Sequence, residues 1–382
     1  MSFFGDIEFF MWLTVMVIPA IVLGLLEKPL KIYGLLVSVL LLIYIMWNDY
    51  HSLLNLGVFY IVELILVKSY CLLRQRFGRN GKIYGCFVFL SIVPVILDKI
   101  SEVSSLSLFQ FLGISYLTFR VVQMIIEIYD GVMKEVNLLE FTGFLLFFPT
   151  FSCGPIDRSR RFSKDWNCIY KRSEYVELVS RGMEKLLLGI AYKFVFAAIF
   201  YQVMGFFSVG KTLLAMTGYA YGYGFYLFFD FAGYSLMVIG TSYLLGIQTP
   251  ENFNKPFLSR DIKDFWNRWH ITLSHWFRDF VFTRFMMKSI KGKWFSSKLT
   301  GASIGFIVNM LIMGLWHGLF VHYILYGLYH GILLAVTEVY QKKSKFYAVH
   351  KQKKWYGRVS WFVTLNLVMF GFLLFSGKLL SF

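Results

Sequence analysis

Apolar residues follow one another along this chain in runs long enough to cross a lipid bilayer as helices. The longest largely apolar runs cover residues 53–73, 106–126, 186–207, 213–245 and 361–377, and shorter ones cover 32–47 and 83–97. These runs lack the short alternating segments of a membrane β-barrel. Since a spanning helix takes about 17–25 residues, the pattern predicts an all-α polytopic transmembrane bundle of about ten to twelve segments, some of them interfacial or re-entrant.

The overall composition also indicates that lipid surrounds much of the chain. Hydrophobic residues make up 57% of the 382 positions and charged residues only 16%. A soluble domain of this size has too small a core to bury so much apolar surface. A net charge of +16 is found in many nucleic-acid-binding proteins. In a chain this apolar we expect no nucleic-acid partner.

The distribution of charge predicts an orientation in the membrane. Residues 68–82 carry five Lys or Arg and residues 341–358 carry seven, with no acidic residue in either segment. Residues 155–172 and 255–293 are also rich in cations. We expect the protein to lie in the cell (plasma) membrane. By the positive-inside rule these basic segments then face the cytoplasm. The loops expected around Asn48–His51 and Asp98–Glu102 are nearly free of cations and then face outward, and alternation places the N-terminus outside.

We expect one membrane domain over residues 1–382, because no linker, low-complexity tract or fixed-period repeat interrupts it. Residues 1–140 read as generic spanning helices, 141–331 as the part that carries the chemistry, and 332–382 as C-terminal helices. The N-terminus has no Lys or Arg before Lys28, so it predicts an uncleaved first helix and not a signal peptide. The four cysteines form no CxxC pair and predict unpaired thiols.

A short amphipathic helix is predicted to begin after Ser259, a favourable N-cap residue. Its apolar stripe consists of Ile262, Phe265, Trp266, Trp269 and Leu273. His270 lies at the edge of that stripe, where it can turn inward. The residues alone leave two roles open for His270: a headgroup-level anchor or a member of a reaction site.

A second histidine, His317, interrupts an apolar run at residues 304–320. Asn309, Met313 and His317 share one helix face at spacings of four, and Gly314 and Gly318 allow close approach beside His317. An ionisable residue this deep is costly and marks a functional site or a packing hydrogen bond to another helix. We take Asn309, Trp316 and Trp269 as supporting candidates.

Asp230 is the only charged residue between Lys211 and Glu251, within an apolar run. A carboxylate there needs a partner, such as a histidine, an arginine or a ring hydroxyl. A structural pairing and a catalytic one both remain open. No HExxH, GxSxG, P-loop or dinucleotide motif is present, so we expect no metal site and no bound cofactor.

Four strings taken together resemble the membrane-bound O-acyltransferase (MBOAT) family, and the most specific is Phe265-Trp266-Asn267-Arg268-Trp269-His270. They cover residues 153–158, 226–235, 264–279 and 314–318. The resemblance implies a ring of tilted helices around a central funnel, with His317 as the catalytic histidine and His270 as its partner. It is greatest to members that transfer D-alanine.

For such members the resemblance also implies the substrates. The donor is D-alanine, held as a thioester on the phosphopantetheine arm of a small acidic carrier protein. The acceptor side leads outward to lipoteichoic and wall teichoic acid, with help from other membrane proteins of the same operon. A transporter or flippase with proton-relaying histidines, and a polysaccharide O-acetyltransferase of the same family, are the alternatives.

Several cations could steer an acidic carrier toward the site. The candidates for this docking rim are Lys255, Arg260, Lys263, Lys288, Lys291 and Lys293. The same residues could instead set topology and contact anionic lipid.

Overall fold

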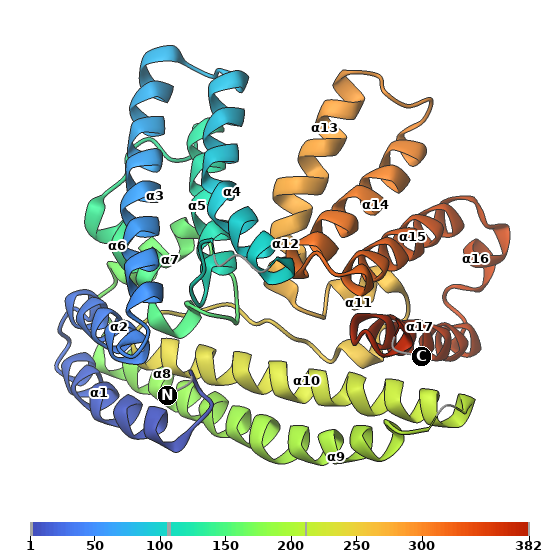
Figure 1. The fold of residues 1–382 in the computed structure, drawn as a ribbon, viewed down its shortest axis with the longest axis horizontal. Helices are drawn as coiled ribbons and strands as arrows, with labels where there is room; N and C mark the ends of the chain where they lie inside the picture. The colour runs from blue at the N-terminus through green and yellow to red at the C-terminus, as the bar shows by residue number, and fades with distance from the viewer. Residues whose placement is uncertain (1–2, 105–107, 211, 381–382) are drawn as a thin grey trace. The chain divides into compact units, whose positions relative to one another are not determined.

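The computed structural model of the chain describes residues 3–104, 108–210 and 212–380, and it is helical in almost all of its ordered elements (Figure 1). The chain forms two compact units. Unit 1 comprises Met1–Ile190 and Tyr234–Pro250, and unit 2 comprises Ala191–Gly233 and Glu251–Phe382. The assignment of residues 1–382 to one membrane domain stays a prediction.

Unit 1 contains the first eight α-helices and the last turns of α10. They are α1 (Ile7–Leu25), α2 (Lys31–Met46), α3 (Tyr50–Phe77), α4 (Gly81–Val103), α5 (Ile114–Tyr129), α6 (Leu138–Leu146), the 3₁₀ turn η1 (Phe148–Thr150), α7 (Ser159–Trp166) and α8 (Arg172–Ile190).

Unit 2 begins with a π-helical turn that continues α8 and ends with the C-terminal helices. It contains η2 (Ala191–Phe196), α9 (Ala197–Phe207), most of α10 (Leu213–Leu244), η3 (Pro256–Leu258), α11 (Ile262–Trp266), α12 (Ile271–Phe277), η4 (Arg278–Phe282), α13 (Thr283–Lys291), α14 (Lys298–His317), α15 (Val321–Lys343), α16 (Lys345–His350), α17 (Lys354–Phe375) and η5 (Lys378–Leu380).

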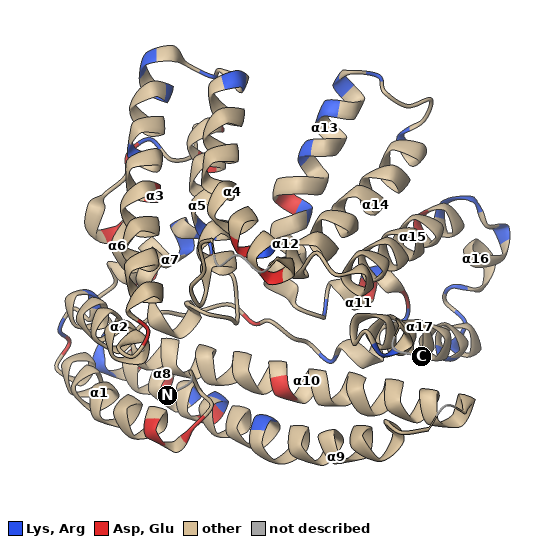
Figure 2. Cartoon of the chain, viewed as in Figure 1, with Lys and Arg blue, Asp and Glu red and all other residues tan. Residues whose placement is uncertain are grey.

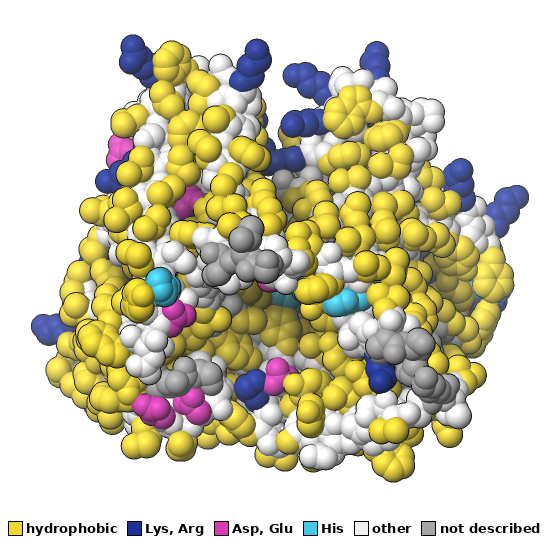
Figure 3. Space-filling model, in the orientation of Figure 1, with side chains coloured by type: hydrophobic (Ala, Val, Ile, Leu, Met, Phe, Trp, Pro, Cys, Tyr) yellow, Lys and Arg dark blue, Asp and Glu magenta, His cyan; other side chains and the backbone are white. Residues whose placement is uncertain are grey.

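Seven helices of the described chain are long and apolar enough to cross a membrane. They are α1, α3, α4, the continuous helix Arg172–Phe207, α10, α14 and α17. Apolar side chains also cover the visible faces of α3 and α4 in Figure 3, as a lipid-facing surface requires. The chain is therefore a multi-pass helical membrane protein, as predicted. Within the predicted apolar run 106–126, the helix α5 begins only at Ile114, so the helix is shorter than expected. Residues 105–107 lie outside the described residues.

The α3–α4 hairpin separates charge along its length. Its turn carries Arg76, Arg79 and Lys82, visible in Figure 2 as blue at the closed end. Asp98 and Glu102 lie near the other end of α4, where both pair with Lys99. The sequence analysis treated 98–102 as a loop, and this was wrong, since these residues belong to α4. The polarity of the hairpin agrees with the charge asymmetry on which the orientation rests.

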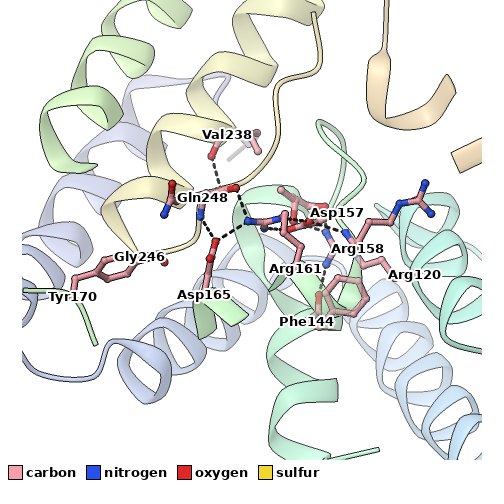
Figure 4. A network of polar contacts seen from close by, with 12 residues as sticks. Arg120, Phe144, Asp157, Arg158, Arg161, Asp165, Tyr170, Val238, Gly246 and Gln248 are labelled. Atoms are coloured by element: carbon pink, nitrogen blue, oxygen red, sulfur yellow. Dashed lines mark hydrogen bonds and ion pairs between the residues drawn. The ribbon is translucent and has the colours of Figure 1, made fainter. Parts of the chain in front are cut away.

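A buried arginine organises the loop after α6 in unit 1 (Figure 4). The side chain of Arg120 on α5 is only 2% exposed and donates to the carbonyl oxygens of Phe144, Leu145 and Thr150. It also donates to the Thr150 hydroxyl at 2.5 Å. Because the guanidinium is satisfied by backbone carbonyls, α5 and the α6–η1 turn form one rigid structure.

A second arginine continues this network toward the end of α10. Arg161 on α7 pairs with Asp157 and Asp165 and donates to the Gln248 carbonyl oxygen at 2.5 Å. The Gln248 amide in turn donates to Asp165 at 2.7 Å. Asp157, from the string at residues 153–158, thus takes part in a network that holds the segment after α10 in unit 1.

Close helix contact in unit 2 depends on glycine. A Cβ atom added to Gly314 on α14 would lie 2.5 Å from the carbonyl oxygen of Tyr323 and 3.2 Å from the Cα atom of Gly327 on α15. Real side chains do not fit at such distances. Gly314 therefore lets α15 pack against the turn that precedes His317, and this confirms the close approach predicted beside that histidine.

Candidate functional site

His270 does not lie within a helix. α11 ends at Trp266, and His270 has φ 43° and ψ 54°, in the left-handed region that non-glycine residues seldom adopt. The predicted continuous helix over residues 259–273 is therefore wrong. The N-cap of α11 is Asp261 and not the predicted Ser259. The apolar positions of the stripe are nevertheless buried: Ile262, Phe265 and Trp266 in α11, Trp269 in the connecting segment and Leu273 in α12.

The segment around Asn252 makes this break possible. The Asn252 carbonyl oxygen accepts from the Ile271 amide at 2.9 Å, and its side-chain oxygen accepts from the Thr272 amide at 3.3 Å. These amides belong to the first turn of α12 and have no partner within the helix. Asn252, from a segment 18 residues earlier, therefore caps α12 in place of a preceding helical turn.

The imidazole of His270 is enclosed by protein. The residue is 4% exposed, Nδ1 lies 3.2 Å from the Asn252 side-chain oxygen, and the Phe231 ring packs edge-on at 4.7 Å. His270 lies outside the seven candidate spans. Burial lowers its pKa well below the ordinary value, to about 3, and the neighbouring His317 lowers it further. His270 is therefore neutral at physiological pH.

His317 ends α14, and Gly318 follows as its C-cap. Its ring contacts those of Trp316, Phe375 and Tyr326, at 4.6, 5.0 and 6.3 Å between centroids. It is partly exposed, in contrast to His270. A positive charge on the His317 ring would lower the pKa of His270. The two predicted histidines of unit 2 are therefore close enough to interact electrostatically.

Two of the supporting candidates, Asn309 and Trp269, are buried in unit 2. Asn309 is buried on the His317 face of α14, and its side-chain oxygen has no hydrogen-bond partner. Trp269 is buried among the rings of Phe253, Phe265 and Phe372. Trp269 therefore packs the core beneath the site, whereas Asn309 offers an acceptor to an incoming group.

A cavity of about 240 Å³ lies beside this region in unit 2. Asn309, Met313 and Trp266 line it, with Lys263, His275 and Arg278 among the polar residues of its wall. The indole nitrogen of Trp266 also has no hydrogen-bond partner. The cavity thus presents a buried donor and a buried acceptor to whatever occupies it.

Asp230 forms an ion pair that the sequence analysis did not name. Its carboxylate accepts from the Lys193 ammonium at 2.5 Å, and both residues lie in candidate spans. The expected partner was a histidine, an arginine or a ring hydroxyl. Lys193 belongs to the π-helical turn η2, whose wider turn places this lysine toward α10.

Neutralising this pair tests whether it is structural. We expect Lys193→Met or Asp230→Asn alone to destabilise the protein by about 1–3 kcal/mol, because each leaves a charge without its partner. The double variant should recover most of that loss. Thermal unfolding in detergent measures this, and acyl transfer by the double variant gives a second readout. A double variant that is stable but inactive would assign the Lys193–Asp230 pair a role in the reaction.

The cations predicted for the docking rim divide into two groups. Lys263 is half-buried; it pairs with Glu338 on α15 and donates to Gln341 at 2.9 Å. The other five are exposed: Lys255, Arg260, Lys288, Lys291 and Lys293. The last three extend the end of α13 and the turn after it.

Among the described residues no group of three or more His, Cys, Asp or Glu side chains is placed to hold a metal ion. Sequence reasoning missed Asn252 and Lys193. No local pattern marks Asn252, whose partners come from a different segment. Lys193 did have a signal, as the only charged residue between Lys185 and Lys211.

The chain belongs to the membrane-bound O-acyltransferase (MBOAT) family, whose sequence model matches residues 77–377. It is therefore an acyltransferase. It is 41% identical to a teichoic acid D-alanyltransferase of Bacillus subtilis, over 99% of this chain and 98% of the relative. It is also 41% identical to a teichoic acid D-alanyltransferase of Streptococcus thermophilus, over 98% and 95%. A probable alginate O-acetylase of Pseudomonas aeruginosa is 31% identical over 70% of this chain and 49% of its own length.

Proposed function

We propose that this protein transfers D-alanine from a carrier-protein thioester toward lipoteichoic and wall teichoic acid. The observation that carries the proposal is the similarity, over nearly the full length of both chains, to the teichoic acid D-alanyltransferases. The alginate O-acetylases match a smaller part of the chain at lower identity. The proposed donor is D-alanine on the phosphopantetheine arm of a small acidic carrier.

The chemistry is acyl transfer from sulfur to oxygen. The acceptor hydroxyl oxygen bonds to the acyl carbon, the carbon–sulfur bond breaks, and the proton of the hydroxyl passes through a base to the leaving sulfur. A neutral imidazole suits this task at physiological pH. We assign the base to His317, which is the more accessible of the two histidines.

The cavity beside α14 supports the proposed donor. An amide group both donates and accepts hydrogen bonds, and a phosphopantetheine arm contains two amides. The indole N–H of Trp266 and the side-chain oxygen of Asn309 offer the complementary pair. An arm bound there would lie along the same face of α14 as His317.

We propose that the protein lies in the cell membrane with its N-terminus outside. When the shorter apolar helix α2 is counted as a further crossing, the turn between α3 and α4 would then face the cytoplasm, together with the basic segment 341–358. The carrier would approach from that side. Other membrane proteins of the same operon would receive the alanine on the outer side.

The exposed cations at the end of α13 are expected to assist carrier binding. Reversing Lys288, Lys291 and Lys293 to glutamate should raise the Kd for the D-alanyl carrier by about tenfold at low salt, mainly through slower association. Since screening acts over about 8 Å at physiological ionic strength, wild-type binding should also weaken as salt rises. Turnover at saturating carrier should change little.

The association and dissociation rates of the carrier are measured on immobilised protein at several salt concentrations. The matched control is the same reversal at Lys342, Lys343 and Lys345, which are equally basic but lie at the end of α15 and the start of α16. Unchanged carrier affinity in the α13 variant at low salt would limit these lysines to membrane topology. The next docking candidate would then be residues 158–164.

Reconstitution of the purified protein in vesicles tests the reaction itself. Radiolabelled D-alanyl carrier is added outside inverted vesicles, and the label is followed to lipoteichoic acid in the presence of the partner membrane proteins. Loss of label from the carrier that depends on this protein supports the proposal. Transfer from an acetyl donor alone would assign an O-acetyltransferase, and movement of substrate without acyl transfer would indicate a transporter.

A further inference from the structure

The side-chain oxygen of Asn252 defines the hydrogen-bonding state of His270. Three groups lie around this one atom: the Thr272 amide at 3.3 Å, the Thr272 hydroxyl at 2.9 Å and the His270 Nδ1 atom at 3.2 Å. A backbone amide can only donate, so the Asn252 atom that faces it is the oxygen and not the NH₂ group. The orientation of the Asn252 amide is therefore settled by the start of α12.

This orientation determines where His270 carries its proton. A neutral imidazole has one N–H and one bare nitrogen. Since Nδ1 faces an acceptor oxygen, the N–H belongs on Nδ1, and Nε2 is left with a lone pair. The opposite arrangement would set a lone pair against the Asn252 oxygen inside a buried site, where unmatched polar groups are most costly.

The backbone holds His270 in this arrangement despite its strain. A left-handed conformation costs a non-glycine residue about 1–2 kcal/mol. His270 adopts it while the Asn252 backbone and side chain cap the following helix. The Phe231 ring packs edge-on against the imidazole from α10. Strain of this kind persists where surrounding contacts fix a side chain that function requires.

We propose that Asn252 is a positioning residue that fixes His270 as the Nδ1–H tautomer, so that Nε2 presents an acceptor to the reacting groups. In this tautomer Nε2 can accept a hydrogen bond but cannot donate one. It does not donate to the oxyanion of the tetrahedral intermediate. Those donors must come from other groups. This inference rests on the proposed acyl transfer for its activity test, but the tautomer itself needs no substrate to be observed.

The tautomer is measured by ¹⁵N NMR on the full chain with ¹⁵N-labelled histidine, reconstituted in nanodiscs. The His270 signals are assigned by their loss in His270→Gln. We expect Nδ1 in the shift range of a protonated ring nitrogen and Nε2 in that of a bare one. A protonated Nε2 in the wild-type protein at neutral pH would overturn the proposal.

Substitutions at Asn252 test its consequence for activity. Asn252→Leu keeps the approximate size of the side chain but removes the oxygen, so a buried Nδ1–H would lack its acceptor and the Nε2–H tautomer should predominate. The kcat for acyl transfer should fall by about 10²-fold, the usual contribution of a correctly protonated acid–base group. The KM for the carrier should stay within about twofold of wild type, since Asn252 is buried and offers no surface for carrier docking.

Two further variants separate positioning from folding. Asn252→Asp restores an oxygen that can accept from Nδ1, and it should recover at least tenfold of the kcat lost in Asn252→Leu, consistent with the typical contribution of such orienting groups. Thr272→Val is the matched control, because it removes one bond to the same oxygen and leaves the bond to His270. Its kcat should stay within about twofold of wild type.

The outcomes are distinct. Equal loss of activity in Asn252→Leu and Thr272→Val, or no recovery in Asn252→Asp, would reduce Asn252 to a helix cap and overturn the inference. If the wild-type protein transfers no acyl group from a D-alanyl carrier, the proposed function fails instead. The NMR signals of His270 still decide the tautomer in that case.

Discussion

Replacing His317 by alanine is expected to abolish measurable acyl transfer while the protein remains folded and able to bind the carrier. Loss of a general base typically costs about 10²–10⁴-fold in rate. The ring of His317 is partly exposed at the end of α14, so its removal leaves no buried cavity comparable to that of a core residue. The effect should therefore lie in kcat and not in stability.

The measurement is transfer of radiolabelled D-alanine at saturating carrier, with thermal unfolding and carrier binding in parallel. His350→Ala is a suitable control, because His350 lies on the short helix α16, where its Nδ1 is 2.9 Å from the Phe346 carbonyl oxygen. A correctly inserted His317→Ala protein that transfers alanine at the wild-type rate would remove His317 from the mechanism.

Loss of His270 is expected to be severe but smaller than loss of His317, at about 10²-fold in kcat. His270 is buried, so alanine there also leaves a cavity beside Phe231 and some loss of stability should accompany the loss of rate. His270→Gln is the better probe, since glutamine fills more of the space.

A double-mutant cycle shows whether the two histidines act as a unit. If they do, the loss in the His270→Gln, His317→Ala double variant will be close to that of His317→Ala alone. Free energies of activation that simply add would mean that the two residues act independently. That outcome would also separate the role of Asn252 from the chemistry at His317.

Local patterns predicted the helical membrane fold because apolar run length directly reflects bilayer thickness. The same reasoning failed at residues 259–273. Spacing showed which side chains are buried, but a period of 3.6 fits one long helix as well as two short ones joined at His270. The break between the two helices is accompanied by hydrogen bonds that the Ile271 and Thr272 amides donate to Asn252. No property of the sequence around His270 reveals these bonds.

For the polar groups inside the apolar runs, the sequence likewise predicted part of the structure and missed the rest. That Asp230 needs a partner follows from the cost of a lone charge among apolar residues. Which partner it has depends on the π-helical turn that places Lys193, and single-sequence patterns seldom reveal such turns. Sequence patterns did not reveal the ion pair of Lys263 for the same reason. Its partner, Glu338, lies 75 residues away along the chain.

The carbonyl oxygens that satisfy Arg120 have a consequence for how this protein is made. During synthesis α5 leaves the ribosome before the residues that supply those oxygens, which end at Thr150. An arginine in the middle of a helix of 16 residues opposes transfer from the insertion machinery into lipid. Arg120 therefore gains its acceptors only after α6 and η1 have been synthesised, so α5 can reach its final packing only together with them.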